Sequence, residues 1–324
     1  MSVSLARFGL AVGHATDEAG ATGCTVIRGV RDAHRAACAV IGRATGSREL
    51  ALLESGHLVE RVDAVLLSGG SAYGLDAAAG VMRWMEARGR GFPVGAGVVP
   101  IVPAAVLFDL APLGRFEARP TAAMAEAACE AAVSEAIAEG AVGAGAGLTI
   151  GKILGKDGAM KGGFGLAIRE EPGCAAAAMV AVNAFGDVRD ASGRIIAGAR
   201  RKGGGFADTE RLLAAGGPDR VFAGGASPNT TLAVVALDAA FTRVELQQVA
   251  RSAIAAYHRR LAPAGSSFDG DIVFALAPME GKRVPLAQAE MLAVAALEEA
   301  IERAVRLAPG TRRRPWARRL SASS

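Results

Sequence analysis

Aromatic residues are scarce in this chain of 324 residues, of which phenylalanine, tryptophan and tyrosine together make up 5%. Glycine is abundant instead, with 42 residues, and 51% of the chain is hydrophobic. Because valine, isoleucine and leucine are also plentiful, the composition indicates close packing of small residues rather than disorder. A chain of this length buries roughly 75% of the surface that its unfolded form exposes.

The four cysteines stand far apart without a C-x-x-C pair, and the four histidines are equally scattered. These patterns predict neither a disulfide framework nor a metal site. The chain also lacks an uncharged apolar run long enough to span a membrane, and its first 20 residues lack the apolar core of a secretory signal. We therefore expect a cytoplasmic protein with no membrane partner, no metal and no cofactor.

The net charge of +4 is concentrated in one segment. Residues 309–324 hold five arginines and no acid, so residues 1–308 carry a net charge of 4 − 5 = −1. A nearly neutral body has no basic surface of the kind that binds nucleic acid, and we expect no nucleic-acid partner. The basic tail over 309–324 is predicted to be disordered.

Continuously apolar runs predict buried strands, and longer periodic segments predict helices between them. The order favours a layered α/β or α+β sandwich in a single domain over 1–308. Thr242 with Glu245 three residues later has the pattern of a capping box at a helix start. The segment 91–110 is interrupted by three prolines and is predicted to be irregular or at a sheet edge. The predicted strands are 62–67, 175–182, 231–237 and 271–277, and the predicted helices are 75–88, 121–139, 243–261 and 285–307.

Three nucleotide or nucleophile motifs come close and fail. A P-loop needs a glycine where Ala146 stands, a dinucleotide fingerprint needs one in place of Ile150, and a nucleophile elbow needs one in place of Tyr73. The glycines that remain indicate tight turns and close packing.

The stretch "SPNTTLAVVAL" carries Asn229, Thr230 and Thr231 at the border between a glycine-rich loop and an apolar strand. It is formally a glycosylation sequon, but the lack of a secretory signal argues against that interpretation. It also has the pattern of a turn that Pro228 and Asn229 would form. A third interpretation is chemical. The Thr230 hydroxyl can attack the carbonyl of Asn229, and the Thr230 amine freed by this cleavage can then act as the base for its own hydroxyl.

Such a nucleophile needs supporting groups. Asp269 and Asp271 are two residues apart, so in an extended chain both carboxylates face one way and can converge on a site, although a solvated turn explains them as well. Two close carboxylates disfavour joint ionisation, so one pKa should rise. Lys152 can polarise the hydroxyl or keep the amine neutral, and Asn183 can donate to an oxyanion. Taken singly, a solvated lysine and a strand-end asparagine are the more common alternatives.

Together these stretches resemble one family. The runs "ATGCTVI", "SGGSAYGLDAAAGVMRWM", "VVPIVPAAVLFDL", "GAGAGLTIGKILG", "VNAFGDV" and "NTTLAVVALDA" follow, over about residues 5–307, the order typical of the P1 (S58, DmpA-like) peptidases. The Asn-Thr junction and the Asp-x-Asp pair are similar to the branch of nylon-oligomer endohydrolases. The aminopeptidase branch has a serine nucleophile and a Ser-x-Glu pair.

The resemblance implies a fold, a cut and an assembly. The fold would be the four-layer αββα sandwich of the DmpA/ArgJ-like, N-terminal-nucleophile hydrolases. Self-cleavage between Asn229 and Thr230 would give chains of 229 and 95 residues that stay together, and the cleaved protomers would form a homo-oligomer, a tetramer in several members. Thr230 matches the nucleophile, Lys152 the family lysine and Asn183 the oxyanion residue. Asp269 and Asp271 match the acidic pair.

One position departs from the family pattern, because Phe108 stands where characterised members have an active-site tyrosine. The resemblance therefore implies that one hydroxyl donor to the oxyanion or substrate is missing, and Tyr73 is a candidate to replace it. The function favoured by the resemblance is hydrolysis of small amides, short peptides or oligoamides through an acyl-enzyme on Thr230. The alternatives are acyl transfer of the ornithine acetyltransferase type and a non-catalytic member of the family.

Overall fold

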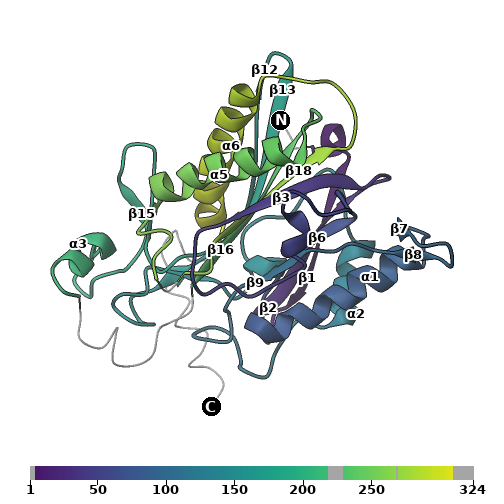
Figure 1. Cartoon of the computed structure of the whole chain (residues 1–324). Helices are drawn as coiled ribbons and strands as arrows, with labels where there is room; N and C mark the ends of the chain where they lie inside the picture. Colours follow the sequence, from purple (N-terminus) through teal and green to yellow (C-terminus); the bar gives the residue numbers. More distant parts are fainter. Residues whose placement is uncertain (1–3, 218–228, 268, 309–324) are drawn as a thin grey trace.

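The computed structural model describes residues 4–217, 229–267 and 269–308, in which two sheets lie between pairs of helices (Figure 1). The smaller sheet consists, in spatial order, of β1 (Leu10–Asp17), β2 (Thr22–Gly29), β6 (Ala64–Ser68), β9 (Ala104–Val106) and β4 (Ser47–Arg48). The larger sheet consists of β12 (Gly163–Glu171), β13 (Cys174–Asn183), β16 (Thr230–Leu237), β18 (Ile272–Pro278), β3 (His34–Val40) and β5 (Arg61–Val62).

Four longer helices cover the outer faces of the sheets. They are α1 (Ala78–Glu86), α2 (Ala122–Glu130), α5 (Arg243–Arg260) and α6 (Leu286–Arg306). The first two pack on the smaller sheet and the last two on the larger one. The order of layers is therefore helix, sheet, sheet, helix, which is the αββα sandwich that the resemblance implied.

Shorter elements make up the rest of the secondary structure in the described residues. The strands are β7 (Phe92–Pro93), β8 (Val98–Val99), β10 (Thr149–Ile150), β11 (Met160–Lys161), β14 (Asp187–Arg189), β15 (Ile195–Ala197) and β17 (Leu261–Ala262). The helical turns are η1 (Ala6–Phe8), η2 (Ala51–Leu53), η3 (Ser71–Ala77), η4 (Gly143–Gly145) and α3 (Thr209–Ala214).

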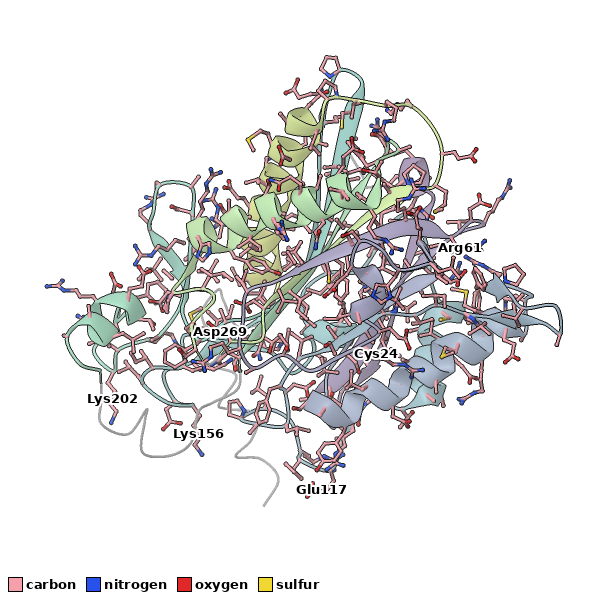
Figure 2. The ribbon with its side chains drawn as sticks, viewed as in Figure 1. Cys24, Arg61, Glu117, Lys156, Lys202 and Asp269 are labelled. Atoms are coloured by element: carbon pink, nitrogen blue, oxygen red, sulfur yellow. The ribbon has the colours of Figure 1, made fainter. Side chains whose placement is uncertain are left out.

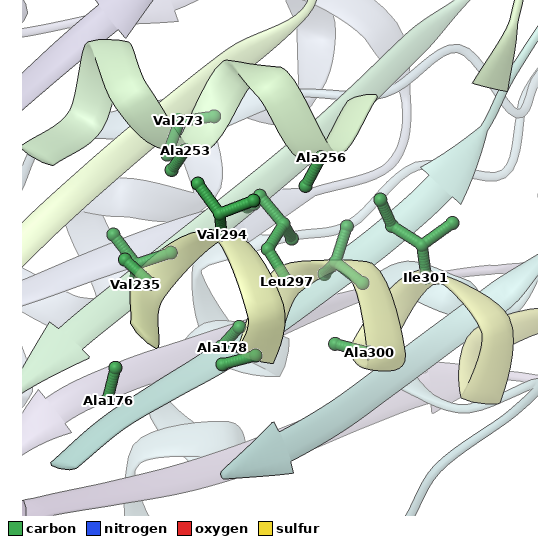
Figure 3. Packing of buried hydrophobic residues seen from close by; sticks show 14 of the residues in the cluster. Ala176, Ala178, Val235, Ala253, Ala256, Val273, Val294, Leu297, Ala300 and Ile301 are labelled. Carbon is green, nitrogen blue, oxygen red and sulfur yellow. The ribbon is translucent and has the colours of Figure 1, made fainter. Parts of the chain in front are cut away.

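Alternate residues of the larger sheet serve two cores. In β16, Leu232, Val234 and Ala236 face the smaller sheet, whereas Ala233, Val235 and Leu237 face the helices. Figure 3 shows the second of these cores, where aliphatic side chains of α5 and α6 pack with Val235 and Val273 of the sheet. Successive residues of a strand point to opposite faces, so a strand between two cores must be apolar at every position.

Glycine sets the closest approach in this core. A Cβ at Gly165 on β12 would lie 2.1 Å from the carbonyl oxygen of Ala300, so α6 contacts the backbone of the strand directly. This explains why a chain rich in glycine and alanine, and poor in aromatic residues, packs into four layers.

The predictions for the C-terminal third are confirmed. The segments 231–237 and 271–277 form β16 and β18, and 285–307 forms α6 within a residue or two of the predicted ends. Thr242 caps α5 in a complete capping box. The Thr242 hydroxyl accepts from the Glu245 amide, and the Glu245 carboxylate accepts from the Thr242 amide.

The helix predicted over 121–139 is wrong beyond Glu130, where α2 ends. Residues after it run beside β1 instead, and Val133 exchanges backbone hydrogen bonds with Val12 in both directions. The tertiary contact with the open edge of β1 overrides the helix propensity of an alanine-rich segment. The helix predicted over 75–88 begins later, at Ala78, after the 3-10 turn η3.

The prediction of an irregular or edge segment over 91–110 is wrong for Ala104–Val106, which form β9, whereas 101–103 and 107–109 have no regular structure. β9 lies between β6 and β4, inside the smaller sheet. It pairs in parallel with β6, and its three residues, Ala104–Val106, come after the prolines and contain none. The prolines at 100 and 103 delay the strand without excluding it. The predicted disordered tail over 309–324 lies outside the described residues.

Candidate active site

Thr230 begins β16 at one end of the larger sheet. Its neighbours there are Asn183, its register partner at the end of the antiparallel strand β13, and Asp269, which forms a bridge with Asn229. Because β16 and β18 run parallel, the residues that precede the two strands lie at the same end of the sheet. Figure 2 places Asp269 at this end of the molecule and Arg61 toward the other.

The peptide bond between Asn229 and Thr230 is buried and polarised. The Thr230 hydroxyl donates to the Asn229 carbonyl oxygen over 2.6 Å, and the Gly270 amide donates to the same oxygen over 2.8 Å. Asn229 is fully buried and Thr230 is 4% exposed. Both donors polarise the carbonyl out of contact with bulk water, and the Gly270 amide is the one placed to stabilise an oxyanion that develops on this oxygen.

Gly270 has little room beside the hydroxyl. A Cβ at this residue would lie 2.8 Å from Thr230 Oγ1 and 2.5 Å from the carbonyl oxygen of Ala44. The residue between the two aspartates must therefore be glycine for its amide to approach Asn229 this closely. Sequence reasoning concentrated on Asp269 and Asp271 and missed the glycine between them, although its place in "DGD" was visible.

Lys152 joins the two asparagines of the site. Its Nζ donates to Asn183 Oδ1 over 2.9 Å, to the Asn183 carbonyl oxygen over 3.0 Å and to Asn229 Oδ1 over 2.7 Å. The chain contains two asparagines in all, and both bind this lysine. Burial lowers the pKa of Lys152 to about 7, with the charges of Asp269 and Asp271 opposing that shift.

The Asn183 side chain has one possible orientation. Its Oδ1 accepts from Lys152 and from the Thr149 amide over 3.0 Å, and its Nδ2 donates to the Phe108 carbonyl oxygen over 3.0 Å. The lysine ammonium and the main-chain N–H of Thr149 can only donate, and the Phe108 carbonyl can only accept. Exchanging Oδ1 and Nδ2 of Asn183 would therefore break every contact.

The two aspartates bind main-chain amides near Thr230. Asp271 Oδ1 accepts from the Thr231 amide over 2.6 Å, and Asp269 Oδ2 accepts from the Ser266 amide over 2.7 Å. Burial raises the pKa of both carboxyls, and the charge of Asp269 raises that of Asp271 further. Both aspartates are 3% exposed, so the alternative of a solvated Asp-Gly turn is wrong.

Tyr257 also supports this end of the sheet, and sequence reasoning missed it. It is fully buried on α5, and the single proton of its hydroxyl is shared between the carbonyl oxygens of Thr231 (3.2 Å) and Ile272 (3.0 Å). One side chain thus bonds β16 and β18 where the two strands begin. The helical spacing of α5 marks Tyr257 only as a core residue.

Phe108, at the position where the tyrosine hydroxyl is missing, and Tyr73, the candidate to replace that hydroxyl, are placed differently. Phe108 reaches the site through its main-chain carbonyl, which binds Asn183. Tyr73 is 52% exposed, and its ring lies under the Arg119 guanidinium at 3.5 Å from the ring centroid. The contacts of the described residues do not join Tyr73 to Thr230 or Asn183, so this arrangement does not show it replacing an oxyanion donor.

The model of peptidase family S58 matches residues 8–314. The chain belongs to peptidase family S58. An uncharacterised aminopeptidase of Mycobacterium leprae is 42% identical over 73% of this chain and 65% of its own length. A 6-aminohexanoate-oligomer endohydrolase of Kocuria sp. is 31% identical over 83% of the chain and 72% of that protein. The chain thus spans a little under two thirds of the length of the mycobacterial relative that it matches.

Solved structures share the S58 fold at low identity. An L-aminopeptidase D-Ala-esterase/amidase of Ochrobactrum anthropi, described as a variant of the Ntn hydrolase fold, aligns with a TM-score of 0.68, 20% identity and coverage of 93% of this chain and 84% of its own. A β-aminopeptidase of Burkholderia sp. aligns with a TM-score of 0.64 and 21% identity, covering 91% and 84%. No helix among the described residues is long and apolar enough to cross a bilayer.

Proposed function

We propose that this protein is a self-processing amide hydrolase that uses Thr230 as its N-terminal nucleophile. The observation that supports this most directly is the scissile carbonyl of Asn229, which receives hydrogen bonds from the Thr230 hydroxyl and the Gly270 amide. Membership of peptidase family S58 supports the same reaction class.

Self-cleavage would proceed as an acyl shift followed by hydrolysis. Thr230 Oγ1 attacks the Asn229 carbonyl carbon, a C–O bond forms and the C–N bond breaks, and the hydroxyl proton ends on the Thr230 nitrogen. Gly270 holds the oxyanion meanwhile. Water then cleaves the ester, leaving a carboxylate on Asn229 and a free amine on Thr230. Lys152 contributes by fixing the Asn229 side chain.

Turnover would reuse the same groups. The freed Thr230 amine, with a reference pKa of about 7.7–8.0, accepts the proton of its own hydroxyl near neutral pH. The substrate carbonyl occupies the position that the Asn229 carbonyl leaves, within reach of the Gly270 amide. Nδ2 of Asn183 has two protons, of which Phe108 takes one, and we assign the other to the substrate oxyanion.

The substrate class proposed is small amides, short peptides or oligoamides. The Kocuria relative is named for 6-aminohexanoate oligomers, which are oligoamides, and the mycobacterial relative for aminopeptidase activity. We also propose a cytoplasmic setting, which fits four free thiols, and a homo-oligomer of cleaved protomers, the tetramer being testable by light scattering.

The deciding experiment is the N-terminal sequence of the purified protein's fragments. Two bands are expected, the smaller beginning at Thr230, and Thr230→Ala should remain a single chain. Full-length wild-type protein that persists after long incubation would overturn the mechanism. Cleaved protein that hydrolyses neither aminoacyl anilides nor 6-aminohexanoate oligomers would overturn the substrate class alone.

A further inference from the structure

Asp109 is a buried carboxylate outside the nucleophile's own contacts. It is 1% exposed and lies in the segment that follows β9. Its Oδ2 accepts from the Thr22 hydroxyl over 2.6 Å, and its Oδ1 accepts from the Gly70 amide over 2.7 Å. It therefore ties the start of β2 and the turn after β6 to the end of β9. Burial raises the pKa of Asp109 to about 6.

The surrounding backbone leaves a space that the carboxylate fills. A Cβ at Gly69 would lie 2.0 Å from Asp109 Oδ2, and a Cβ at Gly147 would lie 2.6 Å from the Asp109 Cβ. Two separate glycine-rich loops thus approach one side chain closely. Both loops belong to stretches in which the nucleotide-binding and nucleophile motifs fail, so those motifs do not explain their glycines.

Asp109 is covalently joined to a group of the active site. The preceding residue, Phe108, offers the carbonyl oxygen to which Asn183 Nδ2 donates. With both carboxylate oxygens of Asp109 bound, the Phe108–Asp109 peptide is held in place. The position of the Phe108 carbonyl decides which way the Nδ2 group of Asn183 points.

Lys161 supports the other end of the Asn183 side-chain amide, where the oxygen Oδ1 lies. Asn183 Oδ1 accepts from the Thr149 amide, and Thr149 on β10 pairs with Lys161 on β11. The Lys161 ammonium, 6% exposed, donates to the carbonyl oxygens of Gly145 (2.7 Å) and Gly162 (2.8 Å). It therefore fastens the segment that carries Thr149.

Lysine is a rare residue in this protein. The chain has 31 arginines and five lysines, and Lys156, Lys202 and Lys282 are exposed. The other two, Lys152 and Lys161, both bind main-chain carbonyl oxygens near Asn183. A compact ammonium on a flexible stem fits among closely spaced carbonyls where a planar guanidinium would not.

We propose that Asp109 and Lys161 are positioning residues which hold the Asn183 amide from its two ends, so that its second Nδ2 proton faces the substrate carbonyl. The inference rests on the oxyanion role that the proposed function gives to Asn183. Neither residue touches the reacting atoms, so each acts only through the main-chain groups of Phe108 and Thr149.

Turnover kinetics test the positioning role proposed for Asp109. Removing an oxyanion donor typically lowers kcat by about 10²–10³-fold, so a misplaced donor in Asp109→Ala should lower kcat by at least about tenfold. KM should stay within about twofold, because the oxyanion contact forms only in the transition state. Asp109→Asn keeps acceptors for the Gly70 amide and should retain most of kcat. Thr22→Val removes one of the two hydrogen bonds to the Asp109 carboxylate, so its kcat should lie between those of Asp109→Ala and Asp109→Asn.

Asp63 supplies the matched control. It is also 1% exposed and accepts from a main-chain amide, that of Ile101 (2.9 Å), but it precedes β6 at the opposite end of the smaller sheet. Asp63→Ala should lower the thermal midpoint without lowering kcat. An equal loss of kcat in Asp63→Ala and Asp109→Ala, or no recovery in Asp109→Asn, would overturn the positioning role.

Nitrogen-15 NMR of the asparagine side chains tests orientation directly. Because the chain has two asparagines, selective labelling in the uncleaved Thr230→Ala background gives two amide groups to follow. Asp109→Ala and Lys161→Met should shift the Asn183 signals and leave those of Asn229 in place, and Asp63→Ala should shift neither. Unmoved Asn183 signals in the first two variants would overturn the inference. This readout needs no activity, so it separates the inference from a failure of the proposed function.

Discussion

The amide nitrogen of Gly270 lies 2.8 Å from the carbonyl oxygen of Asn229, the residue before the proposed nucleophile. This contact joins the residues that lead into β18 to those that lead into β16, and it forms because the two parallel strands begin at the same end of the larger sheet. The Asp-Gly-Asp sequence therefore contributes its middle residue to the reacting carbonyl and its outer residues to the backbone around it.

Gly270→Ala is expected to block self-cleavage. The added Cβ would lie 2.8 Å from Thr230 Oγ1 and 2.5 Å from the Ala44 carbonyl oxygen, so either the hydroxyl or the Gly270 amide must move. Denaturing electrophoresis after long incubation should show one full-length band. Gly97→Ala is the control, because nothing lies within 4 Å of a Cβ there and the variant should cleave as wild type does. Complete cleavage of Gly270→Ala would remove Gly270 from the mechanism.

The sequence was informative where local pattern and tertiary structure agree. The apolar run before Asn183 and the run after Thr230 predict two buried strands, and the capping box at Thr242 predicts the start of α5. The helix predicted to Glu139 failed because the edge of β1 offers Val133 a better set of hydrogen bonds than a further helical turn.

The contacts of the site could be predicted only in part. Family resemblance brought Lys152, Asn183 and Thr230 together as a set of roles. It did not show that Lys152 binds both asparagines, which lie 31 and 77 residues away along the chain. Such contacts depend on the register between β13 and β16 and on the path of the glycine-rich loop, and neither is encoded in local spacing.

Lys152 is expected to make stability rise with pH above neutrality. Burial lowers its pKa to about 7 in the folded chain, whereas a free lysine has a pKa of about 10.4. Between these values the unfolded chain binds a proton that the folded chain lacks, so the free energy of unfolding increases with pH. Below pH 7 both states carry the proton and the buried charge destabilises the fold fully.

Urea unfolding at several pH values between 7 and 9 measures this rise. The comparison is made in the uncleaved Thr230→Ala background, so that every variant is a single chain. Lys152→Met should show a smaller increase with pH than its parent, whereas Lys156→Met, at an exposed position, should match the parent. The same slope in Lys152→Met and its parent would contradict the lowered pKa.

Tyr257→Phe is expected to destabilise the fold without stopping self-cleavage. The variant loses the one hydroxyl proton that the carbonyl oxygens of Thr231 and Ile272 share, a loss of about 0.5–1.5 kcal/mol for one net hydrogen bond. Urea unfolding in the Thr230→Ala background gives the free energy of unfolding, and electrophoresis of the variant with Thr230 intact gives cleavage. The chain has two tyrosines, and Tyr73→Phe, at the exposed one, should leave stability unchanged. Equal stability of the Tyr257 variant and its parent would show that the hydroxyl does not tie the strands.

Hydrolysis, rather than acyl transfer, is expected for the cleaved enzyme. An acyl-enzyme on Thr230 can release its acyl group to water or to an amine, and both reactions would use the oxyanion contacts of Gly270 and Asn183 in the same way. The measurement supplies an aminoacyl anilide with and without a free amine acceptor, and follows the released aniline and the free acid. Aniline and free acid should appear together at equal rates without acceptor. Aniline that is released only when the acceptor amine is present, with a new amide in place of the acid, would identify a transferase on the same fold. Thr230→Ala, which lacks the nucleophile, should release neither product and sets the background rate.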